Sequence, residues 1–263
     1  MPDAGLRPRS ASEIVDAALR LMRAHYAAWV MLLALFTLPS IAFSQVMFDA
    51  MRLTAGAKLA WGPTLAVLGA SVVVNAVAEG VAVTAMAEVY LGRPLDLARA
   101  IARLWSRLLP LLLATVVRWV IMIAGWIVLV VPGVFASIRT ACLDCSVMLD
   151  DASDDGLSAF QRAWSLTADR ESHVFLTMLL MFAIYAVGYV VVMIAVRLAV
   201  FAMPLLHGQR LNSLAQSVLL LFVLPVMPAV RTVLYYDLRV RKEGLDVELL
   251  SRALDAAPAA RPA

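Results

Sequence analysis

The chain has 263 residues, of which 63% are hydrophobic and only 16% are charged. A soluble domain carries about 45–50% apolar residues, so this composition excludes an ordinary water-soluble fold and indicates a chain that faces lipid. The formal net charge of +3 is too small to indicate nucleic-acid binding.

Six apolar runs follow one another along the chain. They are Ala27–Ser44, Leu65–Leu91, Leu108–Val131, Val134–Leu149, Val174–Val196 and Leu214–Tyr236. A helix needs about 20 apolar residues to cross a bilayer, and no run has the period-2 alternation of barrel strands. The sequence therefore predicts an all-α, polytopic bundle of six spans arranged as three hairpins.

The fourth run is the least regular of the six. It has 16 residues and contains Arg139 and Asp144, so two interpretations stay open: a tilted span buried in the bundle, or a re-entrant half-helix. Pro132-Gly133 is expected to form the turn before it. Pro225 and Pro228 are expected to kink the sixth run, because proline removes a backbone hydrogen bond.

Short interfacial amphipathic helices are expected before the first, third and fifth runs. Ser10 and Glu13 have the spacing of a capping box, and the helix they open places Ile14, Ala18 and Leu21 on one face. A second such helix is expected after Pro94. A third is expected near residue 158, where Ser158-Ala-Phe-Gln161 has the same capping spacing.

These helices divide the chain into three units of amphipathic helix plus hairpin, at about 10–92, 93–155 and 156–236. This organisation is either a weak internal repeat or only the periodicity of a hairpin array. The whole of 10–252 is predicted to be one membrane domain, with a tail over 1–9, a short helix over 246–257 and a disordered tail over 253–263.

The placement of Lys and Arg predicts the orientation, because cytoplasmic loops carry the excess of these residues. A six-span topology places 15 of them on the side of both termini and 4 on the other. The first group is Arg7, Arg9, Arg20, Arg23, Arg93, Arg99, Arg103, Arg107, Arg162, Arg170, Arg239, Arg241, Lys242, Arg252 and Arg261, and the second is Arg52, Lys58, Arg197 and Arg210. Both termini are therefore predicted to be cytoplasmic.

Ionisable side chains inside the apolar runs are candidate functional residues, because a charge in hydrocarbon costs several kcal/mol. The sequence predicts a polar cluster near the bilayer midplane, formed by Asn75, Glu79, Arg118, Arg139 and Asp144. Glu79–Arg118 and Arg139–Asp144 are the expected pairs. The cluster is interpreted either as a structural ion network or as a proton or polar-substrate site. Its arginines would keep the carboxylates charged, which suits a static network.

Arginines outside the spans are expected to contact lipid headgroups, since anionic lipid attracts each cation by about 1 kcal/mol. The candidates are Arg20, Arg23, Arg99, Arg103, Arg162, Arg239 and Arg241. By contrast, Glu88 and Arg231 are expected to reach the headgroups from span ends. The amphipathic helices either only connect spans or offer a surface that senses lipid or docks a partner.

No arrangement of residues predicts catalysis. Cys142 and Cys145 form a CxxC spacing, but a zinc site needs a second ligand pair and a redox motif needs a βαβ context. The three histidines, His25, His173 and His207, are scattered. The expectation is therefore no enzyme, no catalytic residue, no metal and no cofactor.

Four segments together resemble bacterial membrane proteins related to the glycerophosphoryl diester phosphodiesterase membrane domain and to the YciC-like family. They are Leu6–Ala18, Val131–Arg139, Phe160–Leu166 and Tyr235–Gly244. The resemblance covers about residues 6 to 252. It implies a six-helix bundle in the bacterial cytoplasmic (inner) membrane. Some relatives carry a soluble phosphodiesterase barrel, for which this chain has no room, so that activity is not expected here.

The leading hypothesis is a non-enzymatic, multi-pass scaffold or accessory protein of the inner membrane. Its partners would be membrane lipids and a membrane or cytoplasmic protein, and not nucleic acid. The alternative is a small transporter or lipid-handling protein that uses the midplane cluster. The substrate, the partner and the oligomeric state stay open.

Overall fold

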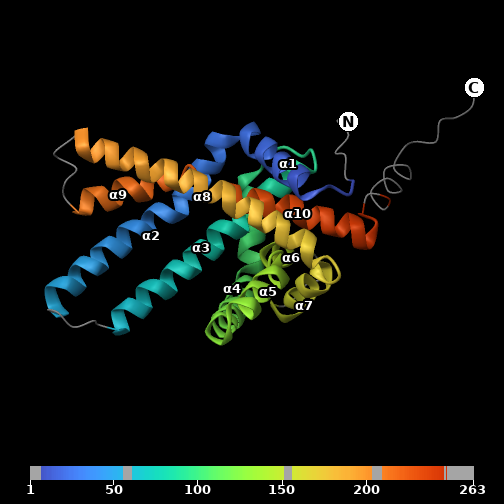
Figure 1. The fold of residues 1–263 in the computed structure, drawn as a ribbon, viewed down its shortest axis with the longest axis horizontal. Helices are drawn as coiled ribbons and strands as arrows, with labels where there is room; N and C mark the ends of the chain where they lie inside the picture. The colour runs from blue at the N-terminus through green and yellow to red at the C-terminus, as the bar shows by residue number, and fades with distance from the viewer. Residues whose placement is uncertain (1–6, 56–60, 151–155, 203–208, 246, 248–263) are drawn as a thin grey trace, which may run out of the picture.

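The computed structural model describes residues 7–55, 61–150, 156–202, 209–245 and 247. All regular structure in these ranges is helical, which confirms the all-α prediction there (Figure 1). The helices are α1 (Ala11–Ala24), α2 (Tyr26–Ala55), α3 (Trp61–Tyr90), α4 (Leu97–Val128), α5 (Val130–Arg139), α6 (Leu143–Leu149), α7 (Gly156–Thr167), α8 (Glu171–Ala202), α9 (Gln209–Leu220) and α10 (Val226–Glu243). Nearly all of the expected helix over 246–257, and the tail over 253–263, lie outside the described residues.

Five segments among the described residues are long and apolar enough to cross a membrane. They are Tyr26–Met47, Thr64–Tyr90, Leu97–Ile127, Val130–Leu149 and Glu171–Ala202. Four of these segments keep most of their apolar window exposed on the protein surface, whereas the fourth, Val130–Leu149, is 61% buried. Apolar faces of this size require lipid as solvent, so the chain is a helical, multi-pass membrane protein.

The sixth predicted run is not one helix. It divides into α9 and α10, with hydrogen-bonded turns over residues 221–225 between them. Pro225, the last residue of this break, contributes to it because it has no N–H to offer the carbonyl oxygen of Leu221 four residues earlier. The Tyr26 hydroxyl donates a hydrogen bond of 2.7 Å to the carbonyl oxygen of Phe222 in the break. The predicted kink is therefore a full interruption.

The third and fourth runs differ from the prediction at their turn. The helix expected after Pro94 and the third run form one continuous helix, α4, with Pro110 inside it. The chain reverses at Leu129, whose backbone is extended, and Pro132 and Gly133 already lie in α5. The fourth run is two helices, α5 and α6, separated by turns over residues 140–142.

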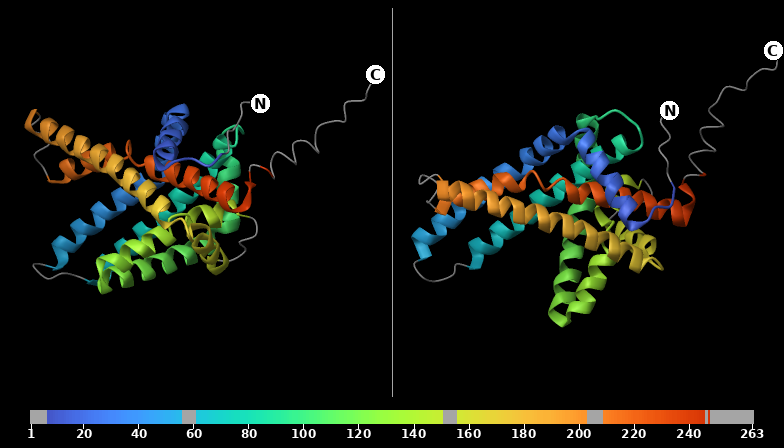
Figure 2. Two further views of the ribbon diagram at one scale, coloured as in Figure 1. Left: turned by 45° about the vertical axis from the view of Figure 1, so that its right-hand side comes forward. Right: turned by 45° about the horizontal axis from the view of Figure 1, so that its top comes forward.

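Three helical arms extend from a common base (Figures 1 and 2). The arms are α2–α3, α4–α5 and α8–α9, and the base is formed by α1, α6, α7, α10 and the adjoining end of α3. In Figure 1 and in the right-hand view of Figure 2 the α4–α5 arm diverges from the other two. The α2–α3 and α8–α9 arms contact each other through α2 and α9.

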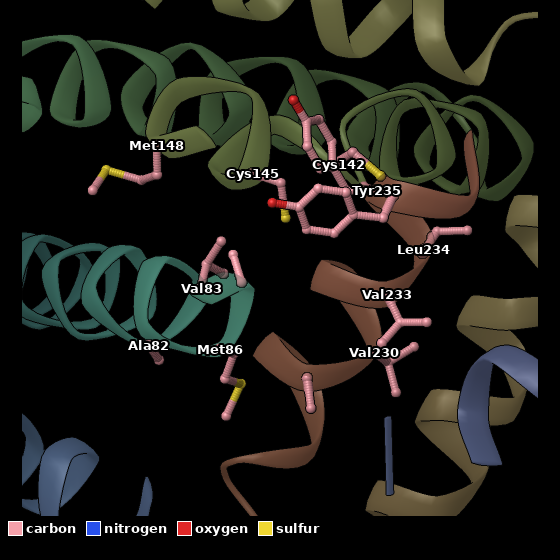
Figure 3. Close-up of a cluster of buried hydrophobic side chains, with 14 of the residues drawn as sticks. Ala82, Val83, Met86, Cys142, Cys145, Met148, Val230, Val233, Leu234 and Tyr235 are labelled. Atoms are coloured by element: carbon pink, nitrogen blue, oxygen red, sulfur yellow. The ribbon is translucent and has the colours of Figure 1, made fainter. Parts of the chain in front are cut away.

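The core lies in the base. Side chains of α3, α6 and α10 converge there, including Met86, Cys145 and Tyr235, each fully buried (Figure 3). Leu21, Leu104 and Leu166, one leucine from each of the three predicted units, all belong to this same core. The three units therefore share one hydrophobic core, whether or not they descend from a repeat.

The first amphipathic helix forms as predicted. The Ser10 hydroxyl accepts from the Glu13 amide, and the Glu13 carboxylate accepts from the Ser10 amide, which completes the capping box. The apolar face of α1, with Ile14 and Ala18, is buried in the protein, against α10 and α8. This face is therefore not free to lie on lipid.

The capping box predicted at Ser158 is wrong. Helix α7 already contains Gly156, so Ser158 is inside the helix rather than at its N-cap. Helix α7 ends near Asp169, which has a positive φ of 59°. The left-handed conformation that Asp tolerates at a helix end turns the chain toward α8.

Candidate functional site: an ion network and a neutral polar cavity

Four charged side chains meet where the arms join the base. Asp144 on α6 accepts a hydrogen bond of 2.5 Å from Arg118 on α4 and one of 3.1 Å from Arg231 on α10. Arg231 also pairs with Glu79 on α3. We call these four residues the ion network. Two carboxylates and two guanidinium groups give it no net charge.

The ion network connects all three units of the chain. Glu79 comes from the first unit, Arg118 and Asp144 from the second, and Arg231 from the third. The side chain of Asp144 is 2% exposed and those of the other three are 13–20% exposed. Removing one member would leave a buried charge without its partner, which typically costs about 3–5 kcal/mol.

The structure corrects the predicted pairing. Within the described residues, Glu79 pairs with Arg231 rather than Arg118, and Arg118 pairs with Asp144. Arg139 lies outside the network: it donates 2.6 Å to Glu171 and 3.3 Å to the carbonyl oxygen of Trp164.

Arg139 is held on the other side by aromatic rings. Its guanidinium group lies over Phe135 and Trp164, at 5.0 and 5.2 Å from the ring centroids. The aromatic contact with α7 and the ion pair with α8 together satisfy the charge of Arg139. The sequence analysis had predicted Asp144 as its partner. The sequence could not reveal this, because α6 turns away after residue 142.

Arg231 is the member that the sequence analysis missed. Its place near the end of the sixth run suggested that it reaches the headgroups, whereas the break before α10 turns it into the protein. Charge balance alone could not identify it in the sequence, because Arg139 already gave the predicted cluster two cations for its two acids. With Arg139 taken up by Glu171, the acids Glu79 and Asp144 need a second cation, and Arg231 is that cation.

A second set of ionic contacts surrounds Asp237, beyond the end of the sixth run. Its carboxylate accepts from the backbone N–H of Arg9 at 2.6 Å and from Arg241 at 2.8 Å, and contacts His173 Nε2 at 3.0 Å. Burial acts to raise the pKa of Asp237, but the hydrogen bonds from His173, Arg241 and Arg9 outweigh it and hold the pKa below its usual range. Asp237 on α10 thus connects the backbone at Arg9, before α1, to His173 on α8.

The seven arginines predicted to contact headgroups divide into two groups. Arg20, Arg23 and Arg99 are exposed, although Arg20 also pairs with Asp16 and Arg99 with Glu88 and Asp96. The other four make contacts within the protein. Arg103 donates to the carbonyl oxygen of Met148, Arg162 pairs with Asp150 and Glu243, Arg239 pairs with Glu243, and Arg241 pairs with Asp237.

A cavity of about 310 Å³ lies between the α2–α3 and α8–α9 arms, and it is partly open. Its described lining residues are Thr37, Ser40, Ile41, Ser44, Gln45, Ser71, Asn75, Tyr185, Ser217, Leu220, Leu221 and Leu224. Eight of these twelve carry a hydroxyl or amide group, and none is charged. We call this space the neutral polar cavity.

Asn75 belongs to this cavity and not to the ion network. It lies one helical turn from Glu79, about 6 Å along α3, but its amide donates 2.7 Å to the carbonyl oxygen of Ser71. The sequence did contain a signal for the cavity. The positions of Thr37, Ser40 and Ser44 recur at helical spacing, so they form one polar stripe on an otherwise apolar helix.

Cys142 and Cys145 are both fully buried free thiols in the base. They belong to the same buried cluster as Met148 and Tyr235 (Figure 3), as expected of small core residues. Among the described residues, no three His, Cys, Asp or Glu side chains are grouped so that they could hold a metal ion.

The fold and the two polar sites define a class: a multi-pass helical membrane protein with a neutral ion network in its base and a hydroxyl-lined cavity between two arms. No family model, no curated protein and no solved structure matches the chain.

Proposed function

We propose that the chain is a non-enzymatic scaffold or accessory protein of a bacterial cytoplasmic membrane, related to the membrane proteins that its sequence resembles. In this proposal α9 and α10 together make the sixth crossing, and both termini are cytoplasmic. The protein acts through lipids or a protein partner.

One observation carries the proposal: each of the four charges in the ion network has an opposite charge within 3.1 Å. A proton relay needs a carboxylate that can change its charge at working pH. In this network each carboxylate already has a guanidinium partner within the protein, and this arrangement supports a structural role.

Proton flux in proteoliposomes tests this role. The charge-balanced variant Glu79→Gln/Arg231→Met should fold, and neither it nor the wild type should carry protons down an imposed pH gradient, followed with an enclosed pH-sensitive dye. Proton flux in the wild type that disappears in the variant would refute the structural role and support a transporter.

The exposed Arg20 and Arg23 on α1 support the lipid contact in this proposal, because their charges remain on the outer face of a helix whose apolar side is buried. In nanodiscs of mixed phosphatidylglycerol and phosphatidylcholine, the full chain should retain anionic lipid through detergent extraction. Arg20→Gln/Arg23→Gln should retain less, while Asp16→Asn, on the same face, should retain at least as much as the wild type. Equal retention by all three proteins would count against headgroup contact at α1.

A second candidate function, lipid handling, is favoured by a different observation. The neutral polar cavity offers hydrogen-bonding groups between helices whose outer faces are apolar. This candidate does not use the ion network.

A further inference from the structure

The neutral polar cavity contains groups that the protein leaves unused. In the part of the chain that the structure describes, the side chains of Ser40, Gln45, Ser71 and Tyr185 line the cavity and make no hydrogen bond to other residues. Polar groups between apolar helices are normally satisfied within the protein. These four are instead available to a molecule in the cavity.

The break in the sixth run adds a backbone acceptor. Leu221 lines the cavity, and its carbonyl oxygen receives no backbone N–H in the described residues, because the residue four positions later is Pro225. Broken helices in membrane proteins place such free carbonyl groups at binding sites. The cavity thus combines hydroxyl donors with a lining residue whose backbone carbonyl has no helical N–H partner.

The lining also limits the charge of the occupant. None of the described lining residues is Lys, Arg, His, Asp or Glu. A phosphate group would lose its hydration there without a cation to replace it, which is strongly unfavourable. An uncharged group that carries hydroxyls or ester carbonyls matches the lining instead.

The surroundings favour a lipid over a water-soluble polyol. Phe43 on α2, Leu68 on α3 and Phe222 in the break belong to the segments that line the cavity, and each is 49–54% exposed. Exposed apolar side chains on these segments match the acyl chains of a lipid. A volume of about 310 Å³ is at the lower end for ligand sites, which fits a headgroup whose chains remain in the bilayer.

We propose that the neutral polar cavity binds the uncharged, hydroxyl-bearing headgroup of a membrane lipid of the diacylglycerol type. Ser40 and Ser71 hydrogen-bond the free hydroxyl, which donates in turn to the Leu221 carbonyl, and the Gln45 amide donates to an ester carbonyl. This inference develops the lipid-handling candidate and does not depend on the role of the ion network.

The test uses the full chain in phosphatidylcholine nanodiscs with a diacylglycerol that carries a photoreactive diazirine in one acyl chain. A phosphatidic acid with the same chains is the charged comparison. We expect the diacylglycerol probe to label peptides of α2, α3 or α9, at least fivefold more than the phosphatidic acid probe. Unlabelled diacylglycerol should compete, and free glycerol should not.

Two pairs of substitutions distinguish the effect of the cavity volume from the effect of its hydroxyl groups. Ser40→Leu/Ser71→Leu fills the cavity, and Ser40→Ala/Ser71→Ala leaves it open without these two hydroxyls; both should reduce labelling at least fivefold. Ser106→Leu, at an exposed position of α4, is the matched control and should label like the wild type. Circular dichroism and elution volume show which variants are folded. If the leucine pair does not fold, the alanine pair alone decides whether the two hydroxyls bind the probe.

The failures can be distinguished. Equal labelling by the phosphatidic acid probe, competition by free glycerol, or unchanged labelling of a folded alanine pair would each overturn the proposal. None of these results bears on proton flux through Glu79→Gln/Arg231→Met, which tests the structural role of the ion network separately.

Discussion

The ion network and the neutral polar cavity are adjacent on α3, yet they use polar groups in opposite ways. At Glu79 every charge is paired with another side chain, so the charges hold three units together. At Ser71 and Asn75, one or two turns away, the groups are uncharged and several have no partner in the protein. Polar side chains inside a membrane protein can therefore either hold helices together or remain available to a bound molecule. Whether a polar group has a partner within the protein distinguishes the two cases.

The largest expected effect comes from removing the carboxylate that two arginines share. Asp144→Asn leaves Arg118 without its ion pair and weakens Arg231, so the free energy of unfolding should fall by about 3–5 kcal/mol. Asp16→Asn, which breaks an exposed pair, should cost less than about 1 kcal/mol. Thermal unfolding in detergent compares the stability losses of the two variants. Similar midpoints would mean that the buried pair stabilises the protein no more than the exposed pair does.

The Asp237 contacts should show a smaller effect that depends on pH. Asp237→Asn should lower the free energy of unfolding by about 1.5–3 kcal/mol at pH 7, the contribution of hydrogen bonds to a charged group. Because the pKa of Asp237 is below its usual value of about 3.9, its contribution is present above about pH 4 and is lost as the pH falls through the folded-state pKa.

The gap between wild type and Asp237→Asn should therefore narrow on acidification below about pH 4, measured by unfolding midpoint against pH. Asp169→Asn is the control, since that side chain is 92% exposed and its loss should change little at any pH. A gap that is constant down to pH 2 would mean that the carboxylate charge of Asp237 does not stabilise the fold.

Packing on α3 should be tighter beside the ion network than beside the neutral polar cavity. A Cβ added at Gly80, beside Glu79, would meet Leu111 at 2.9 Å, whereas one added at Gly69, beside Ser71, has nothing within 4 Å. Gly80→Leu should therefore cost about 1–3 kcal/mol by overpacking, and Gly69→Leu should be neutral or slightly stabilising. Equal costs, from chemical unfolding in detergent, would show that the two halves of α3 are packed alike.

The sequence predicted the class of fold because apolar periodicity and length act locally. The capping box at Ser10, the apolar face of α1 and five of the six runs follow from such patterns. The interruption of the sixth run was only half visible: Pro225 and Pro228 indicate a kink, but the turns between α9 and α10 depend on contacts such as that of Tyr26.

The candidate sites were harder to predict because they depend on which elements meet in space. Glu79, Arg118 and Asp144 were correctly grouped by depth, since a charge in an apolar run needs a partner. Their pairing could not be predicted, because α6 and α10 change direction at breaks that sequence periodicity does not define. Arg231 was misplaced for this reason.

A double-mutant cycle between Glu79 and Arg231 tests the central claim most directly, because these residues belong to the first and third units. The free energies of unfolding of wild type, Glu79→Gln, Arg231→Met and the double variant give the coupling energy between the two side chains. We predict a favourable coupling of about 1–3 kcal/mol, with the double variant more stable than the sum of the single effects allows. A coupling of zero would contradict the ion network as the connection between the units.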